Sequence, residues 1–208
     1  GVTIRNSVIS NNRKQCCSSG IAIRFNGVGL DLYNVDILNN GSPTYGDERT
    51  IVYLTNSDGH WENVRFRGNE ANNELVLLEN SDVEIQNSDF IGNTIQDYDH
   101  SLIKLLYGSN LVLNHVTMSG NSGQGYGIDF SPEYDQKLIV YNSIIDGFDL
   151  GSIRTSGSSN KVFISNSVID NTPSDVSGNG SLSTSNTIFT DIAGINTNGT
   201  LKSTSPAI

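Results

Sequence analysis

One phrase of eleven residues is repeated along almost the whole chain, and it constrains the fold more than any other feature. In the copy VEIQNSDFIGN, which begins at Val83, apolar and polar residues alternate before an Asn, and a large apolar residue then precedes a Gly-Asn turn. Alternation with a period of two indicates strands with one buried face. No 3.6-residue apolar period competes with it, and the abundance of Asn together with 21 Gly disfavours long helices.

Eight copies of the phrase align, and their anchor residues lie 20 to 29 residues apart. The copies begin at Val2, Leu30, Gly59, Val83, Leu111, Leu138, Val162 and Leu182. Seven anchors are asparagines, namely Asn6, Asn34, Asn63, Asn87, Asn142, Asn166 and Asn186, and the eighth is His115. A second apolar strand is expected between copies, for example over residues 21–25, 51–54, 75–78 and 102–106. Insertions therefore fall in loops between fixed strands.

A repeat of this size cannot bury its own apolar face, so successive copies must stack on one another. The sequence predicts an all-β fold, a β-solenoid of about eight coils that pair in parallel, as a single domain over residues 1–208. Val83, Ile85 and Phe90 should point inward with their equivalents in other coils. The anchor Asn tolerates the left-handed backbone of a tight bend, and its side-chain amide can donate to the Asn of the next coil.

The repeated phrase resembles that of right-handed parallel β-helix proteins of the pectate-lyase-like superfamily, over essentially the whole chain. The final residues, 201–208, also resemble the SPAI tail that often closes secreted bacterial proteins of this kind. The resemblance implies a right-handed parallel β-helix at an extracellular or cell-surface location. It does not select a function, because the superfamily includes polysaccharide lyases, hydrolases, phage tailspikes, adhesins and surface proteins. A leucine-rich repeat would require stricter Leu spacing and a helix-like return segment, which this sequence lacks.

Composition narrows the range of partners. The net charge is -10 and the 12 basic residues are scattered, so nucleic acid is not an expected partner. No apolar run is long enough to insert into a membrane. An acidic surface favours solubility or the binding of cations such as calcium, and no other cofactor is expected. The adjacent Cys16 and Cys17 fit free thiols, a vicinal disulfide or an interchain bridge.

One patch of outward charged and polar residues is predicted on three consecutive coils. Its members are Asp31, Tyr33, Asp36, His60, Glu62, Arg65, Arg67, Glu84, Gln86 and Asp89. In the polyuronate lyases of the superfamily that the chain resembles, carboxylates hold calcium and a basic residue removes a proton. By that resemblance Arg65 or His60 would be the base. The calcium ligands would be Glu62, Glu84 and Asp89. A structural charge ladder, in which Asp36, Arg65 and Asp89 alternate in sign, is the alternative that we favour.

A second candidate set lies on the other strand of the repeat and consists of Arg24, Lys104, Asp129 and Arg154. Lys104 is a further candidate base by the same resemblance, although we favour a salt bridge between Lys104 and Asp129 in adjacent coils. Exposed tyrosines can stack on sugar rings, which makes Tyr33 and Tyr98, with Glu62, candidate substrate-binding residues. Sequons for glycosylation begin at Asn40, Asn179 and Asn198.

These patterns favour an extracellular structural or adhesive β-solenoid over an enzyme. Its expected partners are a polysaccharide or other copies of itself, because the chain enters its first coil at Gly1 and ends after Pro206 without an evident polar cap. Such ends indicate either a piece of a longer protein or coils that stack end to end. The alternative is a secreted polysaccharide lyase or hydrolase that acts on an acidic glycan.

Overall fold

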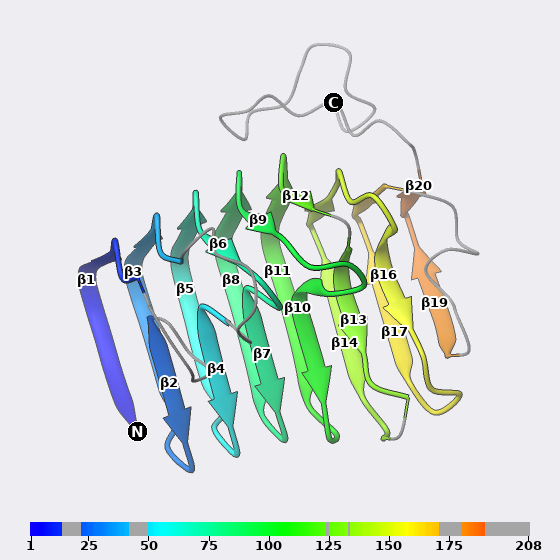
Figure 1. Ribbon diagram of the computed structural model, residues 1–208. Coiled ribbons are helices and arrows are strands. Elements are labelled where there is room, and N and C mark those ends of the chain that lie inside the picture. The colour runs from blue at the N-terminus through cyan, green and yellow to red at the C-terminus, as the bar shows by residue number, and fades with distance from the viewer. Residues whose placement is uncertain (14–21, 42–49, 124, 133, 171–179, 190–208) are drawn as a thin grey trace.

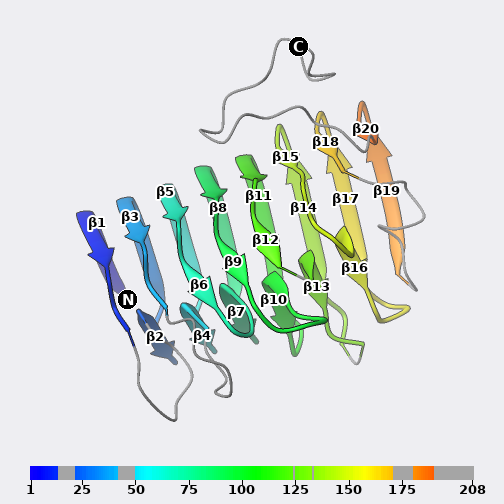
Figure 2. The ribbon, with the colours of Figure 1, turned by 45° about the horizontal axis from the view of Figure 1, so that its top comes forward.

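The chain winds into a parallel β-solenoid, as the repeated phrase predicts (Figures 1 and 2). The computed structural model describes residues 1–13, 22–41, 50–123, 125–132, 134–170 and 180–189. Within these ranges all regular secondary structure is β-strand, and no helix long and apolar enough to cross a membrane is found. The Cys16–Cys17 pair and the tail resembling SPAI lie outside the described residues.

The largest sheet takes one strand from each copy of the repeat and stacks these strands in parallel. In order along the axis they are β1 (Val2–Ser10), β3 (Leu30–Leu38), β5 (Gly59–Arg67), β8 (Asp82–Ile91), β11 (Asn110–Ser119), β14 (Lys137–Tyr141), β17 (Lys161–Ser165) and β19 (Ser181–Ser185). In the last three coils the second half of the phrase forms separate short strands, β15 (Ile144–Ile145), β18 (Val168–Ile169) and β20 (Ile188–Phe189). Equivalent positions of the copies lie opposite one another: Ile4 pairs with Leu32, and Leu32 pairs with Trp61.

Two further sheets complete the coils. The six-stranded sheet consists of β2 (Ile23–Asn26), β4 (Val52–Thr55), β7 (Val76–Glu79), β10 (Ser101–Leu106), β13 (Tyr126–Phe130) and β16 (Gly151–Thr155). The three-stranded sheet, which the sequence pattern did not predict, consists of β6 (Glu70–Ala71), β9 (Thr94–Ile95) and β12 (Ser122–Gly123). The chain completes about six turns, slightly fewer than the eight coils predicted. Counting the anchors overestimated the number of turns, because each complete turn also includes one strand of the six-stranded sheet.

The core is a column of apolar side chains contributed by successive coils. The predicted inward residues Val83, Ile85 and Phe90 are all buried. The rings of Phe66 and Phe90 stack with their centroids 4.4 Å apart, and the Trp61 ring lies 6.0 Å from that of Phe66. Burial of each such side chain stabilises the fold by roughly 1.5–3 kcal/mol. Alternation along the strand is therefore enough to define the core.

The anchors form an exposed line at the bend in each coil, which we call the outer asparagine row. All seven anchor asparagines and His115 have left-handed backbone, with φ between 47° and 55°, as predicted. The Asn34 amide donates to Asn6 Oδ1 over 3.0 Å, and the Asn63 amide donates to Asn34 Oδ1 over 3.1 Å. The amides thus donate to the preceding coil, opposite to the predicted direction.

A second line, the inner asparagine row, comprises Asn40, Asn69, Asn93 and Asn121, each at most 8% exposed. Asn69 Nδ2 donates to the carbonyl of Ile37 over 2.7 Å and to Asn93 Oδ1 over 2.9 Å. Asn69 Oδ1 accepts from the main-chain and side-chain nitrogens of Asn40, both at 3.0 Å. In the sequence these asparagines stand only at the end of a turn. The hydrogen bonds by which they link successive coils were therefore not predicted.

Asn40 also begins one of the predicted sequons. Its side chain is 1% exposed and donates to the Ile9 carbonyl over 2.9 Å, so the folded coil leaves no room for an attached glycan at this position. The other two sequons begin at Asn179 and Asn198, which lie outside the described residues.

Candidate functional site

The outer face of the six-stranded sheet carries a group of charged side chains that contact one another, because outward residues of consecutive coils lie in register. One line across the six strands contains Arg24, Tyr53, Leu77, Lys104, Asp129 and Arg154. Lys104, Asp129 and Arg154 occupy adjacent strands. Arg24 lies three strands before Lys104, so the structure brings together three members of the predicted set and leaves the fourth apart.

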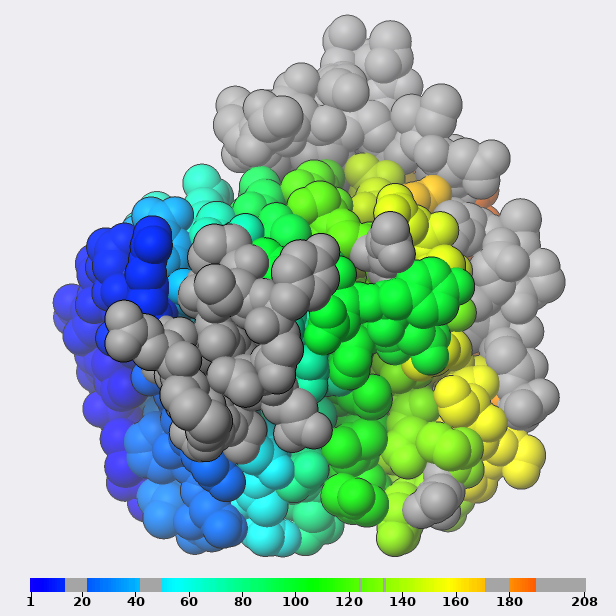
Figure 3. Space-filling model, in the orientation of Figure 1, coloured from blue at the N-terminus to red at the C-terminus, as the bar shows by residue number. Residues whose placement is uncertain are grey.

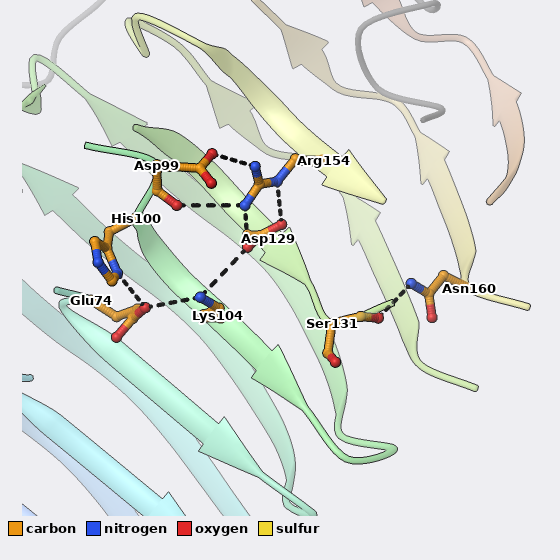
Figure 4. Close-up of polar contacts among 8 residues, drawn as sticks. All are labelled: Glu74, Asp99, His100, Lys104, Asp129, Ser131, Arg154 and Asn160. Carbon is orange, nitrogen blue, oxygen red and sulfur yellow. Dashed lines mark hydrogen bonds and ion pairs between the residues drawn. The ribbon is translucent and has the colours of Figure 1, made fainter. Parts of the chain in front are cut away.

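These three residues belong to a charged network with Glu74, Asp99 and His100 (Figure 4). Lys104 Nζ lies 3.3 Å from Glu74 Oε1 and 3.9 Å from Asp129 Oδ2. Arg154 makes the closer contacts with Asp129, since its Nε and Nη2 donate to the two carboxylate oxygens over 2.7 and 2.8 Å. The predicted salt bridge between Lys104 and Asp129 is present, but Arg154 is the main partner of Asp129.

The segment between β9 and β10 covers part of this face and supplies Asp99 and His100 to the network. It stands out from the face in the space-filling view, in green (Figure 3). Asp99 accepts from Arg154 through its carboxylate, and His100 Nδ1 lies 2.9 Å from Glu74 Oε1. Two ion pairs therefore tie the segment to strands on either side of β10. Tyr98, at 66% exposed, is not drawn into the network.

Burial and pairing set the charges of the network. Glu74 and Asp129 are 4% and 2% exposed, so the network holds two carboxylates almost out of solvent. The hydrogen bond with Glu74 raises the pKa of His100. Burial alone would raise the pKa of Glu74, but the hydrogen bond from His100 and the charge of Lys104 outweigh burial and lower it. The charged forms of both partners are thereby favoured together.

The geometry of the network suits hydrogen bonding better than proton transfer. The Lys104 ammonium lies within 4 Å of two carboxylates, and Asp129 is held by a two-pronged contact from Arg154. A general base needs a free lone pair aimed at the substrate, and an ion-paired ammonium offers none. The Arg154 guanidinium also lies 4.2 Å above the Tyr126 ring, so the network presents fixed donors beside an aromatic face.

The first predicted patch divides into two parts on the large sheet. Near the outer asparagine row, Arg65 donates to both oxygens of Asp36 over 2.5 and 2.6 Å. Arg67 donates to both oxygens of Asp89 over 2.8 and 2.7 Å. Arg65 stands in register between Asp36 and Asp89, as the predicted ladder requires, but Asp89 is held by Arg67, which reaches diagonally to it. A shallow pocket of about 310 Å³ opens here and is lined by Asn34, Asp36, Asn63, Arg65, Asn87 and Asp89.

The second part of the patch lies on the first halves of the same strands. His60 Nδ1 lies 3.4 Å from Glu84, and its Nε2 lies 4.0 Å from Glu62. The Tyr33 ring lies 5.7 Å from the His60 ring, and the Arg5 guanidinium stacks 4.1 Å above Tyr33. These contacts place the candidate substrate-binding residues Tyr33 and Glu62 together.

The three proposed calcium ligands do not fit a calcium site. Asp89 is held in a two-pronged contact by Arg67, whereas Glu62 and Glu84 flank His60. Among the described residues, no group of three or more His, Cys, Asp or Glu side chains is placed to hold a metal ion. No step through calcium is derived from this arrangement.

Sequence reasoning found Lys104, Asp129 and Arg154 but missed Glu74, Asp99 and His100. Glu74 and His100 stand just before β7 and β10, so they approach the network from segments in which alternation does not define an outward direction. A usable signal was the presence of an acid and a histidine, Glu74 and His100, just before the second strand of successive coils. Neither a protein-family model nor a curated protein sequence matches the chain.

Proposed function

We propose that the protein is an extracellular β-solenoid, akin to the pectate-lyase-like superfamily, that binds a glycan on the outer face of the six-stranded sheet without cleaving it. The charged network carries this proposal. Its carboxylates Glu74 and Asp129 are buried and its cations are partly exposed, the side chains fix one another, and three of them lie on consecutive strands. Fixed donors and acceptors of this kind can bind sugar hydroxyl or carboxylate groups with little loss of side-chain entropy.

Aromatic side chains near the same sheet support the proposal. Tyr107 follows β10 and contacts Tyr134 edge to face, with ring centroids 5.3 Å apart. Their side chains are 47% and 42% exposed, so both rings offer apolar surface to a ligand. A ring that is apolar on its face and polar at its hydroxyl suits a sugar, which has both kinds of surface. A polymer that runs along the solenoid axis would meet the network and these rings on neighbouring coils.

Binding can be measured by affinity electrophoresis and calorimetry with neutral and acidic polysaccharides, including pectate and alginate. We expect Lys104→Ala and Tyr107→Ala to weaken binding at least about tenfold, or about 1.4 kcal/mol. Arg65→Ala is the matched control, because it removes an exposed, ion-paired cation from the large sheet and should leave affinity unchanged.

The same samples test the absence of cleavage. Release of unsaturated sugars, followed by ultraviolet absorbance, would overturn the non-catalytic part of the proposal. Loss of binding in Arg65→Ala with full binding in Lys104→Ala would move the site to the large sheet. Failure of every glycan to bind the native protein would contradict the proposal as a whole.

A further inference from the structure

A line of charges crosses the outer face of the large sheet and reverses sign at its middle. In register, the line reads Asp58, Asp82, Asn110, Lys137 and Lys161, with one residue from each of five consecutive coils. The four charged side chains are exposed. Two acids therefore stand on one side of Asn110, and two lysines stand at matching distances on the other.

Within the described part of the chain, these charges lack the partners that other charged residues have. No ion pair of 4.0 Å or less joins Lys137 or Lys161 to a described carboxylate, and none joins Asp58 or Asp82 to a described cation. By contrast, Arg65 and Arg67 on the same sheet each form an ion pair with an aspartate. Like charges directly opposite each other on neighbouring strands are destabilising. The arrangement thus carries a repulsive cost that no ion pair among the described residues offsets.

The acidic half of the line is held in place by the backbone. Asp58 Oδ1 accepts from the Asp82 main-chain nitrogen over 3.1 Å. Asp82 Oδ1 accepts from the main-chain and side-chain nitrogens of Asn110 over 3.1 and 2.8 Å. Both carboxylates are therefore fixed while they still face solvent, as groups that meet a charged partner should be.

An apolar strip lies beside the line, two residues further along the strands. Val112, Ile139 and Phe163 occupy adjacent coils in register. Phe163 is 40% exposed, and Lys137 Nζ lies 5.6 Å from its ring centroid. A shallow pocket of about 230 Å³ opens along this strip. The strip thus adds apolar area beside the lysine half of the line, whereas Glu84 and His60 occupy the positions in register with it on the acidic half.

We propose that two copies of the chain associate face to face through this surface, related by a two-fold axis that runs parallel to the strands at Asn110. Such an axis keeps each line of residues facing itself and reverses the order of the coils. Asp82 then meets the partner's Lys137, and Asp58 meets the partner's Lys161. A two-fold interface must be self-complementary in this way.

The pattern selects a second copy over other partners. A polyanion would be attracted to the lysines and repelled by the aspartates on the same line. A polycation would be attracted to the aspartates and repelled by the lysines. A partner that fits both halves must carry the inverted order of charges at the strand spacing of about 4.8 Å. The chain itself carries that order. The proposal is independent of glycan binding, because it uses a different sheet.

Sedimentation velocity at low and high salt tests the association. The native chain should sediment as a dimer at low salt and shift toward monomer at high salt, because the exposed charges become screened. Lys137→Glu/Lys161→Glu should be monomeric, and so should Asp58→Lys/Asp82→Lys. When the two charge-reversed variants are mixed, a heterodimer should form, since every facing pair is again of opposite sign.

A milder pair of substitutions guards against loss of fold. Asp58→Asn/Asp82→Asn keeps an acceptor for each backbone hydrogen bond and removes only the charge, so it should weaken the dimer without changing the circular dichroism spectrum. A monomeric native chain at low salt would overturn the proposal. So would a native chain whose association survives the lysine reversal, or folded variants that stay monomeric when mixed.

Discussion

The two asparagine rows use the same residue at the same repeat spacing, yet they have different physical roles. Members of the outer row are exposed and adopt left-handed backbone, and the side-chain amides of Asn34 and Asn63 each donate one hydrogen bond to the anchor of the preceding coil. Members of the inner row are buried, and the amides of Asn40, Asn69 and Asn93 each donate both to a main-chain carbonyl and to the next asparagine. A shared residue type therefore does not imply a shared contribution to stability. The outer row sets the path of the chain, and the inner row satisfies polar groups that have no access to water.

The largest effect is expected from Asn69→Ala in the inner row. This substitution removes the acceptor for two nitrogens of Asn40 and the donor for the Ile37 carbonyl. Buried polar groups without partners cost about 1–3 kcal/mol each, so the free energy of unfolding should fall by about 3 kcal/mol or more. Urea denaturation followed by circular dichroism measures the change. A loss smaller than that of the matched outer-row variant Asn63→Ala would reverse the distinction between the rows.

A moderate effect is expected from Asn63→Ala in the outer row. Asn63 has φ 55°, a region that costs most L-residues roughly 1–2 kcal/mol but that asparagine tolerates through local side-chain hydrogen bonds, so alanine should restore that cost. Asn63→Gly removes the strain and should lose less than about 1 kcal/mol, because glycine tolerates this backbone. The same denaturation experiment applies to both variants. If alanine and glycine prove equally destabilising, the side-chain hydrogen bond rather than the backbone conformation is the dominant contribution of this row.

A smaller effect, dependent on pH, should distinguish the charged network from both neutral rows. The pKa of His100 is raised by its bond to Glu74, so the stability it contributes is complete below the ordinary histidine pKa of about 6.5 and is lost as the pH rises through the raised value. Lys104 opposes this shift and Asp97 supports it. Native protein should therefore lose its advantage over His100→Gln as the pH rises above about 6.5, as measured by thermal unfolding. The offset between native protein and Asn69→Ala should stay constant over that range.

At acidic pH the dependence has the opposite sign, because the stability that Glu74 contributes falls as the pH decreases. The pKa of Glu74 is lowered, so its contribution is present above the ordinary value of about 4.5 and is lost as the pH falls through the lowered one. Glu74→Gln should remove both dependences, because the same carboxylate joins His100 and Lys104. A pH profile of Glu74→Gln that still parallels the native one would show that the network does not set this dependence.

Sequence alone predicted the parts of the structure that follow from alternation and register. The buried positions, the left-handed anchors and the adjacency of Lys104 and Asp129 all follow from counting residues along a strand, whereas the place of Arg154 beside Asp129 was not predicted. Outside the strands, alternation does not indicate whether a side chain points inward or outward, and for this reason Glu74 and His100 were not predicted. It also does not limit the reach of a long side chain, which is why Arg67 and not Arg65 holds Asp89.

The inner asparagine row also has a direction. The side-chain nitrogens of Asn40, Asn69 and Asn93 each donate to the asparagine of the following coil, so their amide dipoles point the same way along the axis. The outer row, where Asn34 donates back to Asn6, points the opposite way. Dipoles aligned in series polarise one another, so each bond in the middle of a row is strengthened by its neighbours. The two rows run antiparallel, and the solenoid can gain this mutual polarisation in each row while the opposed dipoles limit the field that accumulates along its axis.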